Sequence, residues 1–271
     1  MKKVVLMIFS CILPLAFLSS CSTMSNRKNS STFFQEEKPY NSIVKIENSI
    51  SYTACKINDE GNPEDCKDAS KEFSGGSGFA IAKDSKRKSR KIGTAAHLCE
   101  FLPIMKKRMK MRAALFGILL KDLKIHSLKV IDDKGETFDA KIKKSDIQLD
   151  ACILEIVEKK GRKKLKKFPA IHLAKEGPKR GKRYFTAGAP LGVNGQEMTF
   201  LTSGLYSGTK ELRENEMDFY SIPSAGGSSG SAILNKRGNL VGVLTMGMRS
   251  FKEVSISPKF SKVHYFFSQN L

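Results

Sequence analysis

Apolar and polar residues alternate along most of the chain from about residue 42 onward, and this two-residue period predicts β-strands. Clear examples are NSIVKIENSISYTA from Asn41, GSGFAI from Gly76 and ACILEI from Ala151. Turn-forming residues separate such runs, as at Asp132–Gly135 and Lys236–Gly238. The pattern therefore favours an all-β domain built from hairpins.

Two segments near the ends of this domain do not alternate. PKFSKVHYFFSQNL at the C-terminus begins with proline and has helical spacing, which predicts an amphipathic helix over 258–270. Phe101 to Ile125 is both apolar and basic, and its period is mixed. We expect either a helix or loop over the first half of the domain, or an amphipathic patch that touches lipid.

The first 21 residues have the pattern of an export signal. Two lysines precede an apolar stretch and small residues follow, which predicts a secretory signal peptide over 1–20. Leu18–Cys21 resembles the lipobox of bacterial lipoproteins, in which Cys21 would be lipidated; the alternative is a plain signal peptide followed by a cysteine. Residues 21–41 are polar and predict a flexible tether. The lipobox predicts an exported protein anchored by lipid in the cell envelope, in the outer membrane where the cell has one.

The composition is strongly basic, with 47 Lys and Arg against 27 Asp and Glu and a formal net charge of +20. The charge is concentrated in Lys83–Lys91, Lys106–Arg112 and Lys159–Lys167. These segments are either solvated loops or a surface for an anionic partner, for which the membrane is the nearest candidate in an anchored protein. Specific nucleic-acid binding is not expected, because aromatic residues are not interleaved with the charge.

Four cysteines lie in the expected domain: Cys55, Cys66, Cys99 and Cys152. An export signal implies an oxidising compartment, so disulfides are expected, and four cysteines allow three connectivities. Cys55 and Cys66 flank a turn-rich segment and would close a hairpin. The spacing of the four cysteines fits no metal-ligand pattern, so no metal is expected.

The segment SAGGSSGSAIL, from Ser224 to Leu234, contains the strongest chemical signal. Ser229 stands in Gly227-Ser228-Ser229-Gly230, directly before an apolar strand. A turn that exposes a hydroxyl beside free backbone N–H groups suits acyl transfer, since the hydroxyl is the nucleophile and the amides stabilise the oxyanion. The alternative is an ordinary Gly/Ser turn.

A serine nucleophile needs a base and an orienting carboxylate. His97 stands in GTAAHLCE and Asp150 in LDACILEIV. Asp146 is the rival carboxylate, but Asp150 directly precedes the apolar strand, where burial can orient it. The other histidines are expected to be structural because none has comparable flanks: His126, His172 and His264.

The order His97, Asp150, Ser229 resembles that of trypsin-like serine peptidases of the chymotrypsin fold, and most closely the HtrA/Deg-type peptidase domain without its PDZ domain. The motifs that carry the resemblance are GSGFAI (76–81), TAAHL (94–98), DACIL (150–154), AGAPLG (187–192), FLTSGLYSG (200–208) and GSSG (227–230). The resemblance implies two six-stranded antiparallel β-barrels, one over 42–158 and one over 168–257, followed by the C-terminal helix. No cofactor is implied.

The resemblance also implies residue roles. Gly227 and Ser229 would supply the oxyanion-hole amides. The substrate strand would pair with Thr245-Met246-Gly247, and the base of the specificity pocket would lie near Pro223-Ser224. A small or medium apolar residue before the cut is expected, or an acidic one given the net charge. Cys99 and Cys152 would be close enough for a second disulfide; the alternative is two buried free thiols.

Two residues depart from the family pattern. Ser231-Ala232 replaces a common Gly-Pro, and Ser228 replaces the Asp of trypsin-like zymogens. Because Ser228 carries no charge, activation through an ion pair with a new N-terminus is not expected.

The sequence thus predicts a membrane-anchored, extracytoplasmic serine endopeptidase that acts on protein or peptide substrates. Two alternatives stay open. One is a catalytically silent, basic binding protein that keeps the peptidase fold, and the other is an esterase that uses the same three residues.

Overall fold

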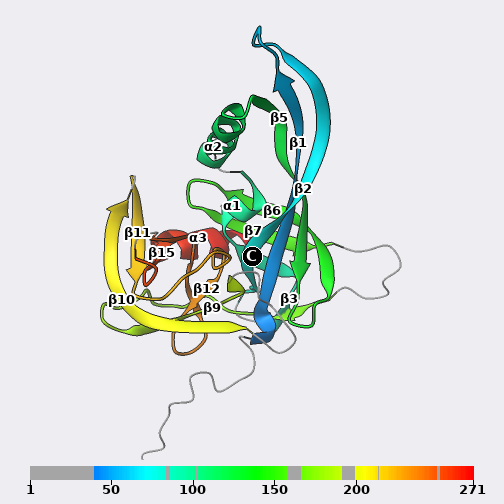
Figure 1. Cartoon of the computed structure of the whole chain (residues 1–271). Coiled ribbons are helices and arrows are strands. Elements are labelled where there is room, and N and C mark those ends of the chain that lie inside the picture. Colours follow the sequence, from blue (N-terminus) through cyan, green and yellow to red (C-terminus); the bar gives the residue numbers. More distant parts are fainter. Residues whose placement is uncertain are drawn as a thin grey trace, which may run out of the picture. The chain divides into compact units, whose positions relative to one another are not determined.

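The structure of the chain is a computed structural model (Figure 1). It describes residues 40–83, 86–101, 103–157, 166–190, 199–212, 214–248 and 251–271. The predicted signal peptide, Cys21 and nearly all of the predicted tether lie outside these residues, as do parts of the first and third basic segments. No helix within the described ranges has the length and apolar character needed to cross a membrane. The described chain is mostly β-structure, which confirms the predicted fold class.

The first half is a closed antiparallel barrel with strand order β1-β2-β4-β7-β6-β5, as predicted. Alternate residues of its strands point inward, so Val44, Ile46, Ile92 and Leu154 are fully buried in its core. The strands are β1 (Ile43–Ile57), β2 (Pro63–Ala80), β4 (Lys91–Thr94), β5 (Ile118–Ile131), β6 (Thr137–Asp146) and β7 (Ala151–Ile156).

The second half is a sheet of seven strands, one more than predicted, because the two-residue strand β14 adds to its edge. Its order is β13-β12-β9-β10-β11-β15-β14. The first and last strands in this order follow one another in the chain, so the sheet curls toward closure. The strands are β9 (Arg183–Gly188), β10 (Phe200–Leu212), β11 (Asn215–Tyr220), β12 (Ala232–Leu234), β13 (Leu240–Val243), β14 (Met246–Gly247) and β15 (Ser255–Pro258).

Smaller elements complete the fold. A 3-10 turn, η1 (Tyr40–Ser42), precedes β1, and β3 (Lys88–Ser89) pairs with β8 (Phe168–Pro169). The C-terminal helix α3 (Phe260–Asn270) confirms the predicted helix but begins two residues later, because Pro258 still pairs with Met217 in the sheet.

A shared core joins the two halves and the C-terminal helix. It combines Phe79 and Ile153 of the first barrel with Leu234 and Val243 of the second sheet and Phe267 of α3. These side chains are almost fully buried. The β2 and β7 strands that position the site are therefore fixed by packing from both halves.

The mixed segment from Phe101 forms helix α2 (Pro103–Ala114) and the beginning of β5. Proline at the first helical position and a run of Lys, Arg, Met and Ala favour a helix here. Met105, Met109 and Ala113 recur at helical spacing and are partly buried, and the helix packs against β5 (Figure 1). The basic residues of α2 are exposed on its other faces.

Candidate active site

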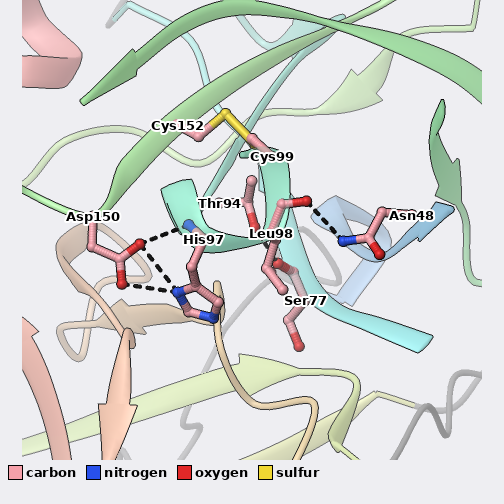
Figure 2. Close-up of a disulfide and its surroundings, with 8 residues drawn as sticks. All are labelled: Asn48, Ser77, Thr94, His97, Leu98, Cys99, Asp150 and Cys152. Atoms are coloured by element: carbon pink, nitrogen blue, oxygen red, sulfur yellow. Dashed lines mark hydrogen bonds and ion pairs between the residues drawn. A yellow bond between two sulfur atoms is a disulfide. The ribbon is translucent and has the colours of Figure 1, made fainter. Parts of the chain in front are cut away.

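His97 and Asp150 form a double hydrogen-bonded pair (Figure 2). His97 Nδ1 lies 2.9 Å from Asp150 Oδ2 and 3.1 Å from Oδ1, and Oδ1 also accepts the backbone N–H of His97 at 2.8 Å. Both side chains are largely buried, with 15% of the His97 side chain and 16% of the Asp150 side chain exposed. With Nδ1 donating to the carboxylate, a neutral imidazole has a lone pair on Nε2 that can accept a proton.

A single helical turn, α1 (Ala96–Cys99), presents His97 directly after β4. Its residues Leu98 and Cys99 are buried, so the turn is anchored in the barrel core. The carbonyl of Leu98 also accepts a hydrogen bond from Asn48 Nδ2 at 3.0 Å (Figure 2). The backbone around His97 is therefore held by the barrel core, by Asn48 and by Asp150.

Asp150 sits at the end of the turn between β6 and β7, in the left-handed region with φ +54°. Aspartate tolerates this conformation better than most residues. The rival carboxylate Asp146 begins the same turn, and its Oδ1 accepts the backbone N–H of Leu149 at 2.9 Å. The two carboxylates thus have separate tasks: Asp146 closes the turn, and Asp150 meets the imidazole.

Disulfides confirm both predicted cysteine pairings. Cys99 and Cys152 each lie two residues after a member of the His97–Asp150 pair, and their bond ties α1 to β7 (Figure 2). The second bond, Cys55–Cys66, joins β1 to β2 near the end of their hairpin.

Two consecutive β-turns carry Ser229. Ser228 N–H donates to Ala225 O and Ser231 N–H donates to Ser228 O, each at 3.0 Å. The third residue of each turn is a glycine with positive φ, Gly227 at +86° and Gly230 at +84°, which is the signature of type II turns. The dense glycines therefore form an ordered double turn, and Ser229 is the second residue of the second β-turn.

Ser77 of β2 joins this double turn to the first barrel. Its backbone N–H donates to Ser229 O and its hydroxyl donates to Gly227 O, both at 2.8 Å. The same hydroxyl accepts the N–H of Ala189 at 2.8 Å, and Ser77 O accepts the hydroxyl of Thr94 at 2.7 Å. Ser77 is fully buried. Sequence reasoning missed this role, although Ser77 lies inside the quoted GSGFAI motif.

The Ser229 turn and the His97 segment are in direct contact. A Cβ atom built on Gly230 would lie 2.3 Å from Thr94 Oγ1 and 3.1 Å from Leu98 Cδ1. Only glycine allows this approach. The structure therefore brings all three predicted residues to one region at the junction of the two halves.

Three groups at this turn have no hydrogen-bond partner among the residues that the structure describes. Within the described part of the chain, Ser229 Oγ makes no hydrogen bond to His97 or to another residue. The backbone N–H groups of Gly227 and Ser229 likewise donate to no acceptor among those residues. One hydroxyl and two amides are thus free to meet a ligand.

The predicted substrate-binding residues separate into two groups. Pro223 and Ser224 line a cavity of about 250 Å³ whose wall also includes Ser228. Thr245 is buried, whereas Met246 and Gly247 form β14, the last strand in the order of the second sheet. In the described chain β14 pairs only with β15, so its other edge has no strand partner among the described residues.

Ser224 fills the space in front of Gly247. A Cβ built on Gly247 would lie 2.4 Å from Ser224 Oγ, and Ser224 Oγ donates to Val254 O at 3.4 Å. Ser224 N–H also donates to Lys252 O at 2.9 Å, which fixes its backbone. The serine side chain therefore occupies the space beside Gly247 that the missing glycine side chain leaves.

The remaining histidines lie apart from these contacts. His126 is exposed on β5, His172 lies before β9, and the His264 ring on α3 stands 5.4 Å from that of Phe260.

Solved structures share this fold at low sequence identity. The active form of the Rv3671c protease from M. tuberculosis is 15% identical, with a TM-score of 0.53 over 86% of this chain and 82% of that one. Its inactive form scores 0.52, again at 15% identity, over 86% of this chain and 90% of that one. The HtrA-type protease AlgW with a decapeptide is 17% identical, with a TM-score of 0.56 over 86% of this chain and 64% of that one. The nearly equal scores for the active and inactive forms mean that this similarity concerns the fold.

Curated protein sequences include no match to the chain. A family model, described as the trypsin-like peptidase domain, matches residues 76–243. The match begins at the GSGFAI strand and ends with β13, so it includes His97, Asp150 and Ser229 and covers more than half of the chain. By this match and its chymotrypsin-like fold, the chain belongs to the family of trypsin-like peptidases.

Proposed function

We propose that this protein is a serine endopeptidase in which Ser229, His97 and Asp150 form the catalytic triad. The observation that carries the proposal is the His97–Asp150 pair, with Nδ1 2.9 Å from Oδ2, next to a docked double turn that presents Ser229. Membership of the trypsin-like family supports the coarser statement that the chain is a serine protease.

In the proposed reaction, Ser229 Oγ attacks the peptide carbonyl carbon while His97 Nε2 takes the hydroxyl proton. The carbonyl oxygen becomes an oxyanion, which the free N–H groups of Gly227 and Ser229 stabilise by about 3 kcal/mol per donor. The imidazolium then protonates the leaving amine, and the C–N bond breaks to leave an acyl-enzyme. Water attacks the acyl carbon with His97 again as base. The imidazolium then returns the proton to Ser229 Oγ as the ester bond breaks, and the acid product leaves.

The missing hydrogen bond between Ser229 and His97 is compatible with this scheme. Catalytic hydrogen bonds are often long before substrate binds and shorten in the Michaelis complex. The carbonyl of Ser229 is held by Ser77, which fixes the backbone that carries the hydroxyl.

Labelling with a fluorophosphonate probe tests the nucleophile. The wild-type chain should be labelled, Ser229→Ala should not, and Ser207→Ala should be labelled as well as the wild type because Ser207 is exposed on β10 away from the turn. Labelling of a folded Ser229→Ala variant would refute the assignment.

We further propose that the substrate lies extended along β14 and carries a small residue before the cut. The support is the open edge of Met246–Gly247 and the filled space between Gly247 and Ser224. Cleavage of a random peptide library tests this specificity and also separates a peptidase from an esterase, which would leave the peptides intact.

Export and lipidation of Cys21 remain part of the proposal, and they are supported by the signal-like N-terminus. Growth of the source cell, or of a bacterium that expresses the chain, with an alkyne fatty acid tests the anchor. The wild-type chain should be labelled and partition into membranes, whereas Cys21→Ser should be unlabelled. An unlabelled wild-type chain would favour a plain signal peptide.

Helix α2 is the proposed contact with anionic lipid. Its cationic residues are exposed, and Met111, Leu115 and Phe116 at its C-terminal end are 60%, 84% and 73% exposed. Cations beside exposed apolar side chains suit the surface of an anionic bilayer. Binding to vesicles that contain phosphatidylglycerol should fall in Leu115→Ser/Phe116→Ser and persist in Leu205→Ser, which removes an exposed leucine from β10.

A catalytically silent binding protein is the second candidate, favoured by the unpaired Ser229 hydroxyl together with this basic helix. A cellular phenotype that persists in Ser229→Ala but disappears when Lys106–Arg112 is neutralised would select this alternative.

A further inference from the structure

A second cavity, of about 910 Å³, lies on the second sheet. It is at the ends of β9 and β12 that point away from the Ser229 turn. One wall is residues 172–185, which lead into β9, and the other is the turn between β12 and β13. His172 O accepts Leu240 N–H at 2.8 Å and Leu240 O accepts Ala174 N–H at 2.9 Å, so the walls are joined by backbone hydrogen bonds.

The lining of this cavity is unusually cationic even for a basic chain. Six of its fifteen lining residues are Lys or Arg, against 47 of 271 in the whole sequence, and Glu176 is the one acidic residue among those fifteen. The six are Lys175, Lys179, Lys182, Arg183, Lys236 and Arg237. General basicity of the protein does not account for such a concentration.

Most of this charge is not neutralised by protein groups. Glu176 pairs with Lys179 at 2.8 Å, and Arg183 donates to Ser203 Oγ at 3.1 Å. Arg237 interacts with the charge of Glu176 at longer range, and the other three cations form no ion pair with any described residue. Because like charges from two separate segments face one space, an anion between them would relieve their repulsion.

The walls are ordered by hydrogen bonds of their own. Asn235 Oδ1 accepts the N–H groups of Arg237 at 2.9 Å and Asn239 at 3.1 Å. On the other wall Tyr184 Oη accepts Lys179 N–H at 2.8 Å. The cations therefore extend from a fixed frame, which lowers the ordering cost of binding.

One residue of the cavity wall carries an unsatisfied polar atom. His172 contributes to the wall, and its Nδ1 is buried without a hydrogen-bond partner in the described chain. A buried ring nitrogen without a partner is unfavourable, and a turn of the ring toward the cavity would let it hydrogen-bond a bound anion.

We propose that this cavity binds a ligand bearing several phosphate groups, either a soluble polyphosphate or the phosphorylated headgroup of a lipid. Phosphates offer multiple charges and acceptors to Lys and Arg, and the cavity has the size of a small-molecule site. The proposal does not depend on catalysis, so Ser229→Ala should bind the same ligand.

Calorimetric titration of the full chain with sodium tripolyphosphate, in detergent and at about 150 mM salt to screen weak surface contacts, tests the site. We expect saturable binding that weakens about tenfold or more in Lys236→Gln/Arg237→Gln and also weakens in His172→Gln. The matched control, Lys106→Gln/Lys107→Gln on α2, removes the same charge and should change the affinity less than about twofold. Lys236 and Arg237 are exposed in a turn, so their replacement should leave the fold intact, which circular dichroism checks.

Equal weakening in both double variants, or no saturable binding, would overturn the proposal. So would tighter binding of a glutamate-rich peptide of equal charge, because the site would then recognise acidic protein. Vesicles containing phosphatidic acid identify the source of the phosphate. If the protein sediments with these vesicles, and both tripolyphosphate and the Lys236→Gln/Arg237→Gln change prevent this, the ligand is a lipid headgroup. If neither changes the sedimentation of the protein, the ligand is soluble.

Discussion

The backbone N–H of Ser77 donates to the carbonyl of Ser229 at 2.8 Å, although 152 positions separate the two residues in the chain. This bond crosses from the first barrel to the second half of the fold. It fixes the backbone of the proposed nucleophile relative to β2, which in turn pairs with β4 just before His97. The position of Ser229 is therefore determined largely by the barrel that carries His97, its proposed base.

Ser77→Ala should lower activity through the position of the turn. The change leaves Gly227 O and Ala189 N–H without their shared partner, at a cost of about 1–3 kcal/mol for a buried group left unpaired. We expect kcat to fall more than KM rises, because the oxyanion donors shift while the substrate edge at β14 stays. Peptide hydrolysis and a thermal melt check this, with Ser207→Ala as control; a variant destabilised with unchanged kcat would leave Ser77 a purely structural role.

Asp150→Asn and Asp146→Asn should separate the tasks of the two carboxylates. The first should reduce kcat by about 10⁴-fold, because an amide no longer holds the imidazole in the tautomer that leaves Nε2 free. The second weakens only the bond to Leu149 N–H, so we expect a stability loss of about 1 kcal/mol and a much smaller loss of activity. Steady-state kinetics of both variants would contradict this division of roles if Asp146→Asn were the more damaging.

The two disulfides should differ in their effect on catalysis. Loop entropy predicts a stability loss of about 4 kcal/mol for Cys99→Ala/Cys152→Ala and about 3 kcal/mol for Cys55→Ala/Cys66→Ala, since the bonds span separations of 53 and 11 residues. Only the first pair lies beside His97 and Asp150, so only its removal should lower kcat at a temperature where both variants are folded. Urea unfolding and kinetics check both; equal kcat losses would show that the position of the bond is unimportant.

Ser224→Gly should widen the specificity pocket. It removes the side chain that touches Gly247. The kcat/KM for substrates with a medium apolar residue before the cut should therefore rise relative to the kcat/KM for substrates with alanine there. A methylene in such a pocket changes kcat/KM by about 10–200-fold. Paired peptides that differ at that residue measure the ratio, and an unchanged ratio would place the pocket elsewhere. In that case a retained fluorophosphonate reaction would show that Ser229 is still the nucleophile.

How much of the fold and of the site the sequence predicts depends on how far apart in the chain the interacting residues lie. Alternation predicted the strands, and local flanks singled out His97, Asp150 and Ser229, because these signals lie within a few residues. Ser77 and the narrowing by Ser224 depend on contacts between distant segments, which no local pattern records. The sequence favours Asp150 through its expected burial, and the structure adds a turn closed by Asp146 and a positive φ. The sequence does not decide between a helix and a loop at α2, because the apolar and basic residues there share no clear period.

Gly227→Ala and Gly226→Ala offer a matched test of the oxyanion hole. Gly227 has φ +86°, which strains alanine and favours a type I turn, in which the peptide between 226 and 227 is reversed. That reversal turns the Gly227 N–H away from the oxyanion and should reduce kcat by about 10²–10³-fold. Gly226 is outside the positive-φ region, and a Cβ built there meets no atom within 4 Å, so Gly226→Ala should keep near wild-type activity. Hydrolysis rates and thermal melts of the two variants decide the matter, because similar rates in two folded variants would mean that the Gly227 amide does not contact the reacting oxygen.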